Sequence, residues 1–221
     1  MVARSVGIES GRARVERCEC CIKTNRGKRE WQIAKNFDVW EKESERAWKE
    51  DNKDLMFPDT VLGWLRKYVP VPATVLDAGC AIGKFVKLFK RLGYECIGIE
   101  QSITGVRYAR QFVPEAVIIW DRIQNLDKHF ERGIFDIIFT SAVIQHNTHE
   151  RKKVLLGQFK HVLKPRGYYL MTECTIRLEK GQKEDGYSFT KEHYVDFMKE
   201  QGFALLEYVD PWPFYLWRLS S

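Results

Sequence analysis

The feature that most constrains the fold is a short apolar run that passes through a glycine-bearing turn into an amphipathic segment. Residues 75–78 are mainly apolar, Gly79 and Gly83 follow them, and helical spacing of apolar side chains begins near Lys84. Glycine lets the backbone come close to a ligand, and the first turn of a helix presents N–H groups that lack intrahelical partners. This segment therefore predicts a buried strand, a ligand-binding turn and a helix.

Beyond Pro72, short apolar runs alternate with longer amphipathic segments. The strand-like runs are residues 74–78, 96–100, 116–120, 135–140 and 168–173. The clearest helix-like segments are residues 84–92, 104–112, 149–163 and 190–201. Two further strand-like runs, 204–209 and 215–219, are joined by a connection so short that only an antiparallel hairpin fits. We predict an α/β fold with a mostly parallel seven-stranded sheet, a terminal antiparallel hairpin and helices on both faces.

The chain has 221 residues, which suffices for one sizeable core with an extension. Residues 1–29 are rich in Arg, Lys, Glu and Gly without apolar periodicity, so we expect a flexible basic extension. In residues 30–70, apolar side chains recur at helical spacing, which predicts two helices ahead of the sheet. We expect these helices to form a lid over the main domain, residues 71–221.

The charge and hydropathy of the chain restrict its location and its partners. The net charge of +6 comes from 36 basic and 30 acidic residues scattered along the chain, so it favours an anionic partner only weakly. No stretch approaches the roughly 18 uncharged apolar residues of a membrane-spanning helix. Charges stand near the start where a signal peptide has its apolar segment. We expect a cytoplasmic protein without a membrane partner, and the sequence leaves its oligomeric state open.

The six cysteines do not suggest a disulfide framework. Three lie in or beside apolar strand-like runs, where reduced cysteine acts as a small apolar side chain: Cys80, Cys96 and Cys174. The other three lie close together near the start: Cys18, Cys20 and Cys21. A structural zinc site needs four ligands, and no second Cys/His pair follows at the required spacing. We expect free thiols and no metal.

The second apolar run ends in an acidic residue, Glu100, about 20 residues beyond the glycine turn. An acid at this place can accept hydrogen bonds from both hydroxyls of a ribose. The turn and the acid together indicate an adenosine-type cofactor. A nicotinamide dinucleotide is the alternative, but residues 79–83 do not meet its G-x-G-x-x-G motif.

These residues resemble the motifs of the class I S-adenosylmethionine (SAM)-dependent methyltransferases. The first motif of that family is D-x-G-x-G-x-G, and Asp77, Gly79 and Gly83 match it, while Ala81 replaces the middle glycine. The added methyl group of Ala81 would tighten the turn around the methionine part of the cofactor. The second strand of the family ends in Asp or Glu, as it does here at Glu100.

Three further segments resemble the family in its order along the chain. Residues 121–126 resemble the D-A-x-x-L segment, whose acid faces the adenine amino group. Residues 135–138 resemble the fourth strand, and residues 162–167 resemble the L-K-P-G-G turn into the fifth. The resemblance implies a Rossmann-like methyltransferase fold and a SAM-binding domain in residues 71–221. The implied cofactor-binding residues are Asp77, Gly79, Cys80, Ala81, Gly83, Glu100, Gln101, Asp121, Arg122 and Ser141.

Methyl transfer from SAM is an in-line displacement, so the main task of the protein is to hold the acceptor in line with the methyl group. A hydroxyl acceptor also has to lose a proton, and histidine suits that role. His146 follows the fourth strand, where ligands bind in open α/β sheets, and is our candidate catalytic residue. The alternative is that His146 makes a structural hydrogen bond. The weaker candidates are His149, His193 and Tyr194.

The acceptor class is restricted mainly by absent motifs. The fourth strand leads into residues 140–143 rather than N-P-P-Y or Pro-Cys, which argues against the methylation of adenine, glutamine amide or cytosine C5. Aromatic residues ahead of the sheet and in the hairpin suit a small molecule: Trp40, Trp48, Phe57, Trp212, Phe214 and Tyr215. We predict methyl transfer to an O or N atom of a small-molecule acceptor. The alternatives are RNA or protein as the acceptor, bound through the basic extension, and a non-catalytic subunit.

Overall fold

The computed structural model describes residues 37–50, 55–173, 189–210 and 213–220. They belong to one unit, Gln32–Ser221, and the other unit, Met1–Trp31, lies outside the described residues. The predicted extension of residues 1–29 therefore lies outside them, together with Cys18, Cys20, Cys21, Cys174 and Trp212. In the described part of the chain, no helix is both long and apolar enough to cross a membrane.

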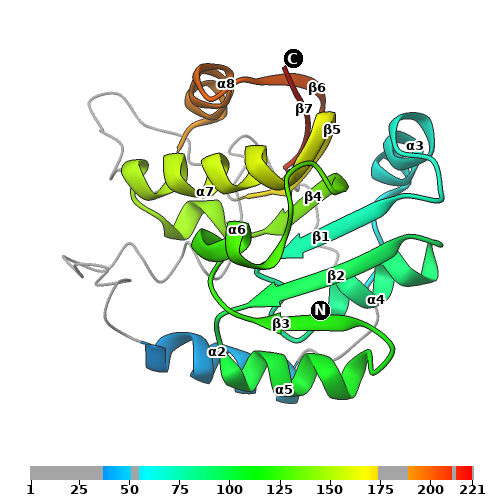
Figure 1. Ribbon diagram of the computed structural model, residues 1–221, viewed down its shortest axis with the longest axis vertical. Coiled ribbons are helices and arrows are strands. Elements are labelled where there is room, and N and C mark those ends of the chain that lie inside the picture. The colour runs from blue at the N-terminus through cyan, green and yellow to red at the C-terminus, as the bar shows by residue number, and fades with distance from the viewer. Residues whose placement is uncertain (1–36, 51–54, 174–188, 211–212, 221) are drawn as a thin grey trace, which may run out of the picture. The chain divides into compact units, whose positions relative to one another are not determined.

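Seven strands form a single sheet, and helices precede and connect them (Figure 1). The strands are β1 Thr74–Ala78, β2 Glu95–Glu100, β3 Val117–Trp120, β4 Phe135–Ser141, β5 Leu163–Thr172, β6 Phe203–Val209 and β7 Phe214–Leu219. The helices are α2 Phe37–Glu50, α3 Asp59–Tyr68, α4 Lys84–Arg91, α5 Ile103–Phe112, α6 Leu126–His129, α7 His149–Val162 and α8 Lys191–Glu200. Two short 3-10 turns, η2 Ile123–Asn125 and η3 Ile144–His146, complete the elements.

The strand order is β3-β2-β1-β4-β5-β7-β6. The first five strands pair in parallel, while β7 pairs antiparallel with both β5 and β6. The predicted fold class is thereby confirmed, including the terminal hairpin. Most strand boundaries lie within one residue of the prediction, and the largest difference is at β5, which begins at Leu163 rather than at Tyr168. Leu163 already pairs with Phe135, and after an irregularity the pairing resumes between Tyr168 and Ile137.

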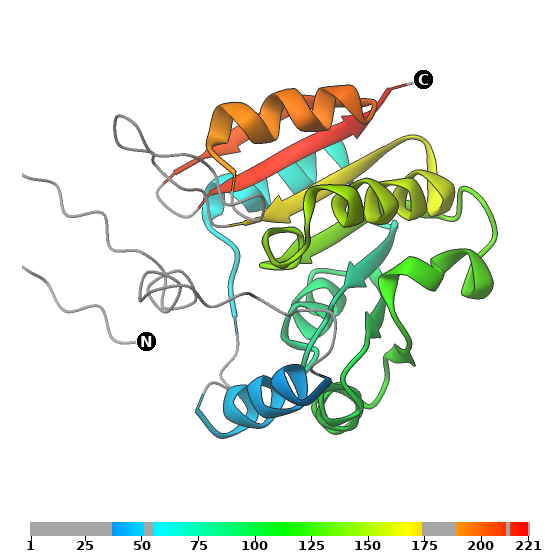
Figure 2. The same cartoon turned by 90° about the vertical axis from the view of Figure 1, so that its left-hand side faces the viewer.

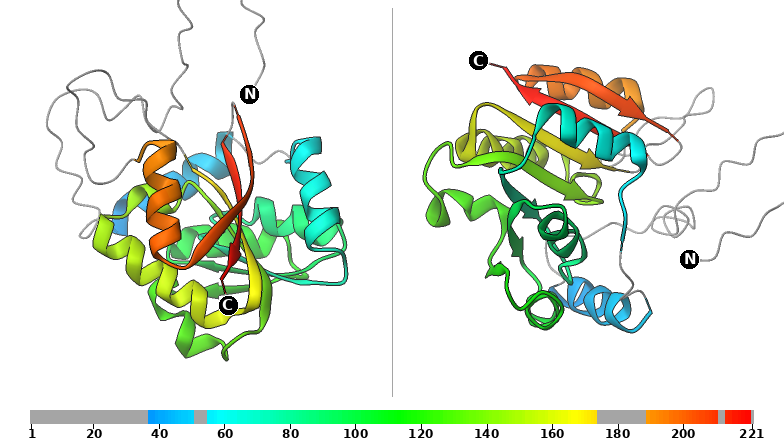
Figure 3. Two further views of the ribbon diagram at one scale, coloured as in Figure 1. Left: turned by 90° about the horizontal axis from the view of Figure 1, so that it is seen from above. Right: turned by 90° about the vertical axis from the view of Figure 1, so that its right-hand side faces the viewer.

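Side chains along the central strands alternate between two buried clusters, one on each face of the sheet. Val75 and Ile137 belong to the cluster that contains α3 and α4, whereas Leu76 and Ile138 belong to the cluster that contains α7 and α8. Figure 3 shows α7 and α8 on one side of the sheet and α3 and α4 on the other. Parallel strands covered on both faces have apolar side chains in both directions, which accounts for the continuous apolar runs in the sequence.

The two helices predicted ahead of the sheet occupy different places. α3 is part of the core, and four of its side chains are buried beside α4: Val61, Leu62, Trp64 and Leu65. α2 instead lies beside α5 (Figure 2), where Trp48 stacks on Tyr108 with ring centroids 4.6 Å apart. Of these two helices, only α3 therefore contributes described side chains to the core clusters.

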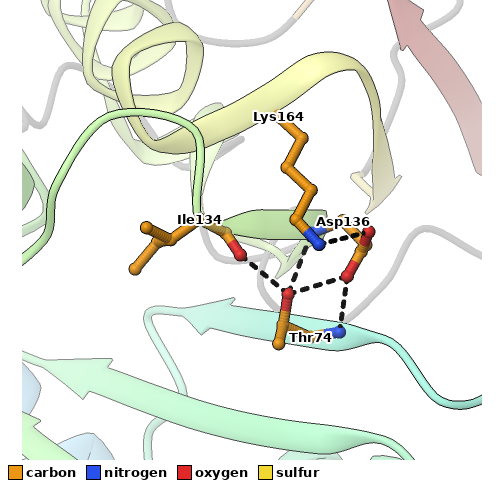
Figure 4. A network of polar contacts seen from close by, with 4 residues as sticks. All are labelled: Thr74, Ile134, Asp136 and Lys164. Atoms are coloured by element: carbon orange, nitrogen blue, oxygen red, sulfur yellow. Dashed lines mark hydrogen bonds and ion pairs between the residues drawn. The ribbon is translucent and has the colours of Figure 1, made fainter.

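A polar network ties the starts of β1 and β4 together at the amino edge of the sheet (Figure 4). The Thr74 hydroxyl lies 2.9 Å from the Ile134 carbonyl oxygen and 2.8 Å from Asp136 Oδ2, and it accepts the Asp136 N–H at 3.1 Å. Lys164 Nζ donates to Asp136 Oδ1 at 2.8 Å. Burial raises the pKa of Asp136, but the Lys164 ammonium and the Thr74 donors outweigh it and leave the pKa below its ordinary value.

We expect Thr74→Val to lower the free energy of unfolding by about 1–3 kcal/mol, because the Asp136 N–H loses its acceptor while the side-chain shape is kept. Urea denaturation measures the difference. Thr60→Val, on the exposed surface of α3, is the control and should stay within about 0.5 kcal/mol of the unchanged protein. Equal stability of the two variants would contradict a stabilising role for this network.

Candidate functional site

The candidate site lies at the carboxyl edge of the sheet, because parallel strands end at the same edge. Asp77 stands near the end of β1, Glu100 ends β2 and Ser141 ends β4. Asp121 directly follows β3, and Glu173 directly follows β5. The fold thus brings together side chains that are up to about a hundred residues apart in the sequence.

The turn between β1 and α4 takes a conformation that favours glycine. Gly79 and Gly83 have φ angles of +84° and +80°. A Cβ on Gly79 would lie 2.7 Å from Val143 Cγ2, and one on Gly83 would lie 3.1 Å from Ala109 Cβ. Ala81 also has a positive φ, of 47°, although it carries a side chain. The two glycines are therefore required both by backbone conformation and by close packing.

The turn is fastened to β2 through backbone hydrogen bonds. The Gly79 and Cys80 N–H groups both donate to the Ile99 carbonyl oxygen, at 2.8 and 3.1 Å. The Cys80 side chain is buried against Gly98, so only its backbone is directed to the turn. Cys80 and Cys96 are both buried free thiols.

The carboxylate of Glu100 is buried and accepts hydrogen bonds from the backbone of the glycine turn and of the segment before α5. Its Oε2 accepts the Ala81 N–H at 3.0 Å, and its Oε1 accepts the Ser102 N–H at 2.7 Å. Burial raises the pKa of Glu100, and these N–H donors oppose the rise. Each carboxylate oxygen can accept two hydrogen bonds, so capacity remains for further donors such as hydroxyl groups.

Asp77 is buried at the base of the turn, and its Oδ2 atom has no hydrogen-bond partner among the described residues. Burial, together with the nearby Glu100 carboxylate, raises the pKa of Asp77 to about 8. The two acids give the base of the turn a negative potential once they ionise. Such a potential favours a positively charged ligand.

Asp121 makes a set of polar contacts that the sequence did not suggest. Its Oδ2 pairs with His129 Nε2 at 2.6 Å, and its Oδ1 accepts from the Arg122 N–H and from Asn125 Nδ2 at 2.7 and 2.8 Å. Burial raises the pKa of Asp121, but His129 and the other donors outweigh it and lower the pKa to about 2. Beside it, the Gln101 carbonyl oxygen accepts the Trp120 indole N–H at 3.0 Å.

His146 lies in η3, just past β4, and faces α2. Its ring lies edge-on to Trp40, with ring centroids 5.2 Å apart. Burial lowers the pKa of His146 to about 4, although the nearby Glu43 carboxylate opposes the shift. The imidazole is therefore neutral near pH 7, which is the form that accepts a proton.

α2 is fixed on the amino end of α5 by a carboxylate. Glu41 accepts the Ile103 and Thr104 N–H groups, each at 2.9 Å, and Ser44 Oγ donates to Ser102 Oγ at 3.1 Å. Glu41 was missed in the sequence, because its role depends on α2 packing on α5. Glu173 was also missed, although an acid directly after an apolar strand was a usable signal.

The weaker candidates belong to an aromatic cluster between α7 and α8. His193 stacks on Phe189 with ring centroids 3.9 Å apart, and the His149 ring lies 4.8 Å from the Phe197 ring. Tyr194 is fully buried there. Of the aromatic residues expected to line an acceptor pocket, Phe57, Phe214 and Tyr215 are buried in the two core clusters. Trp40 is the one that contacts His146.

The strand order, the antiparallel β7, the glycine turn and the acid at the end of β2 define a Rossmann-like protein with a nucleotide-type site. Residues 76–171 match the family model of a methyltransferase domain. The fold is similar to that of magnesium protoporphyrin IX methyltransferase from Synechocystis PCC 6803 with bound S-adenosylhomocysteine (SAH). That match has a TM-score of 0.66 and 15% identity, and covers 85% of this chain and 100% of the other.

Two curated relatives are similar in sequence. EEF1A lysine methyltransferase 2 from Homo sapiens is 25% identical over 161 residues, which cover 66% of this chain and 61% of that protein. A ubiquinone biosynthesis O-methyltransferase from Rhodopseudomonas palustris (strain HaA2) is 32% identical over 103 residues, which cover 46% of this chain and 39% of that protein. The chain thus spans about two fifths to three fifths of the length of these relatives. The family-model match and these relatives support a class I SAM-dependent methyltransferase family for the chain.

We expect Asp77→Asn to stabilise the protein relative to the unchanged chain, and to do so more at pH 8 than at pH 5. The folded-state pKa of about 8 lies above the ordinary value of 3.8. The folded state therefore binds the proton more tightly, and stability is lost as the pH rises from about 4 to 8. Asparagine removes that loss. Thermal unfolding at the two pH values measures the difference.

The exposed Asp196→Asn substitution in α8 is the matched control and should show no such increase between pH 5 and pH 8. If Asp77→Asn increases thermal stability equally at pH 5 and pH 8, Asp77 is not buried with a raised pKa.

Proposed function

We propose that the chain transfers the methyl group of SAM to a small-molecule acceptor, with a hydroxyl oxygen as the favoured acceptor atom and nitrogen as the other choice. The observation that carries this proposal is the partly buried, neutral imidazole of His146 beside Trp40 at the carboxyl edge of the sheet. A neutral imidazole can take the proton that an acceptor hydroxyl loses, although its lowered pKa makes it a weaker base than an ordinary histidine.

The residues at the turn fit SAM as the cofactor. Glu100 keeps lone pairs that suit the two ribose hydroxyls, beyond the two backbone N–H groups it already accepts. The carboxylates of Asp77 and Glu100 suit a ligand that carries positive charge on sulfur and on an amino group. Gly79, Cys80, Ala81 and Gly83 would contribute through their backbone.

The other proposed cofactor-binding residues lie around the ends of β2, β3 and β4. In this proposal Gln101, Asp121 and Arg122 contribute to the adenine side of the ligand, and the contact of Asp121 with His129 supports a fixed orientation of its carboxylate. Ser141 ends β4 next to the segment that carries His146. Their roles are part of the proposal.

SAM, when bound, supplies a methyl group on a positively charged sulfur that is already activated for displacement. His146 would take the proton that an acceptor hydroxyl loses on methylation. Trp40 covers one side of the imidazole and limits the access of water, which keeps the ring neutral. The strand ends and the glycine turn hold the reacting groups in place.

We include in the proposal a domain organisation of three parts. Residues 71–221 form the SAM-binding domain, residues 30–70 supply the lid through α2, and residues 1–29 form a flexible basic extension. The contacts of Glu41, Ser44 and Trp48 with α5 support α2 as the part that covers the site. A cytoplasmic location also belongs to the proposal, and the buried free thiols agree with it.

The second candidate function is methylation of a macromolecule. The match to the human relative, a lysine methyltransferase by name, covers more of this chain than the match to the bacterial O-methyltransferase. In that case the basic residues of the extension would attract RNA or an acidic protein surface. A non-catalytic subunit that only binds SAM is the remaining alternative.

We expect labelled SAM and a panel of phenols and other small hydroxyl compounds to yield at least one methylated product, with one SAH formed per methyl group. His146→Ala should lower kcat on that acceptor by about 100-fold or more, because the proton acceptor is lost. His161→Ala, in the last turn of α7, is the matched control and should leave kcat unchanged.

Deletion of residues 1–29 separates the acceptor classes. Unchanged turnover on the small acceptor is expected. Labelling of RNA or protein alone, abolished by the deletion, would favour the second candidate. No labelled product from any acceptor, or full turnover by His146→Ala, would contradict the proposed chemistry.

A further inference from the structure

The carboxylate of Glu173 accepts several hydrogen bonds from β4 and the segment that follows it. Its Oε1 accepts the Val143 and Ile144 N–H groups, both at 3.0 Å, and the Thr140 hydroxyl at 3.2 Å. Its Oε2 accepts the Gln145 N–H at 3.1 Å. The residue directly follows β5 and is only 2% exposed. Four donors from β4 and the segment after it thus converge on one buried carboxylate.

The three backbone donors are those at the start of η3, which lack partners within the turn itself. The carboxylate of Glu173 therefore acts as a cap supplied by the adjacent strand. Burial raises the pKa of Glu173 to about 7, and the backbone donors oppose that rise. A buried carboxylate without such donors would be strongly unfavourable, so the two elements stabilise each other.

The backbone of this segment also needs to be held. Ala142 has a φ of +55°, a left-handed conformation that is unfavourable for a residue with a side chain. Its N–H donates to the Thr172 carbonyl oxygen at 2.8 Å. The end of β5 therefore fixes the segment at Ala142 through the backbone and at residues 143–145 through Glu173.

Two side chains of the held segment reach the candidate site. Val143 Cγ2 lies so close to Gly79 that any Cβ there would be 2.7 Å away, so the segment packs directly on the glycine turn. His146, at the end of η3, faces Trp40 of α2. Movement of the segment would shift His146 relative to both the turn and the lid.

We infer that Glu173 is a positioning residue, which holds the segment after β4 so that His146 stands at a fixed place between the glycine turn and α2. This inference rests on the proposed function for its catalytic consequence, because it assigns to His146 the proton of the acceptor. The structural part, control of His146 by Glu173, is independent of SAM and of any acceptor.

Glu173→Gln tests the inference, since it keeps the side-chain shape but replaces one acceptor oxygen with an NH₂ group. The readout is the titration of the His146 imidazole by NMR in histidine-labelled protein, with the signal assigned by His146→Gln. In the unchanged protein this signal should titrate near pH 4. In Glu173→Gln it should titrate at least one pH unit higher, because the released segment admits water to the ring.

Turnover on the small acceptor gives a second readout. We expect kcat of Glu173→Gln to fall at least tenfold, while the calorimetric Kd for SAH changes by less than threefold. Glu207→Gln is the matched control, because Glu207 lies on β6 and its hydrogen bonds come from Tyr68 and Lys67 rather than from η3. This substitution should change neither the His146 titration nor kcat.

Glu173→Asp keeps the charge and both acceptor oxygens, but its side chain is one methylene shorter, so the carboxylate lies farther from the N–H donors. It should shift the His146 titration in the same direction as Glu173→Gln, and it decides the test if the glutamine variant does not fold. A folded variant with an unshifted His146 titration would overturn the inference. If the unchanged protein neither binds SAH nor turns over, the proposed function fails, while the His146 titration still decides the role of Glu173.

Discussion

The carboxyl edge of this sheet depends on hydrogen bonds from backbone N–H groups to buried carboxylates. Glu100 holds the glycine turn to the start of α5, and Glu173 holds the segment after β4 to β5. Charged groups are buried only where donors of this kind compensate for lost water. The two held segments then meet where Val143 packs on Gly79. Two acids thus fix both sides of the proposed reaction site.

The same edge collects several unfavourable features. Ala81 and Ala142 have left-handed backbone conformations, and burial raises the pKa values of Asp77 and Glu173. Features of this kind persist when the surrounding structure holds them in place, and they tend to occur at functional sites. The amino edge, by contrast, has a satisfied network around Thr74 and Asp136, which suits a purely structural role.

The sequence predicted the parts of the fold that depend on local patterns. The apolar runs, the glycine turn and the short connection before β7 sufficed for the mostly parallel sheet and its terminal hairpin. Contacts between distant segments were not predictable: Glu41 acts on α5 only because α2 packs there, and His129 meets Asp121 only through α6. For Glu173, the acid at the end of a strand was visible in the sequence, but its donors, about thirty residues away across a strand pair, were not.

The assignment of the site rests on the binding of SAM at the carboxyl edge through Glu100, which calorimetric titration with SAM and SAH measures. We expect micromolar binding that Glu100→Gln weakens at least tenfold, about 1.4 kcal/mol, and that Glu207→Gln leaves unchanged. Absence of binding by the folded, unchanged protein, or equal affinity of the Glu100→Gln variant, would contradict it.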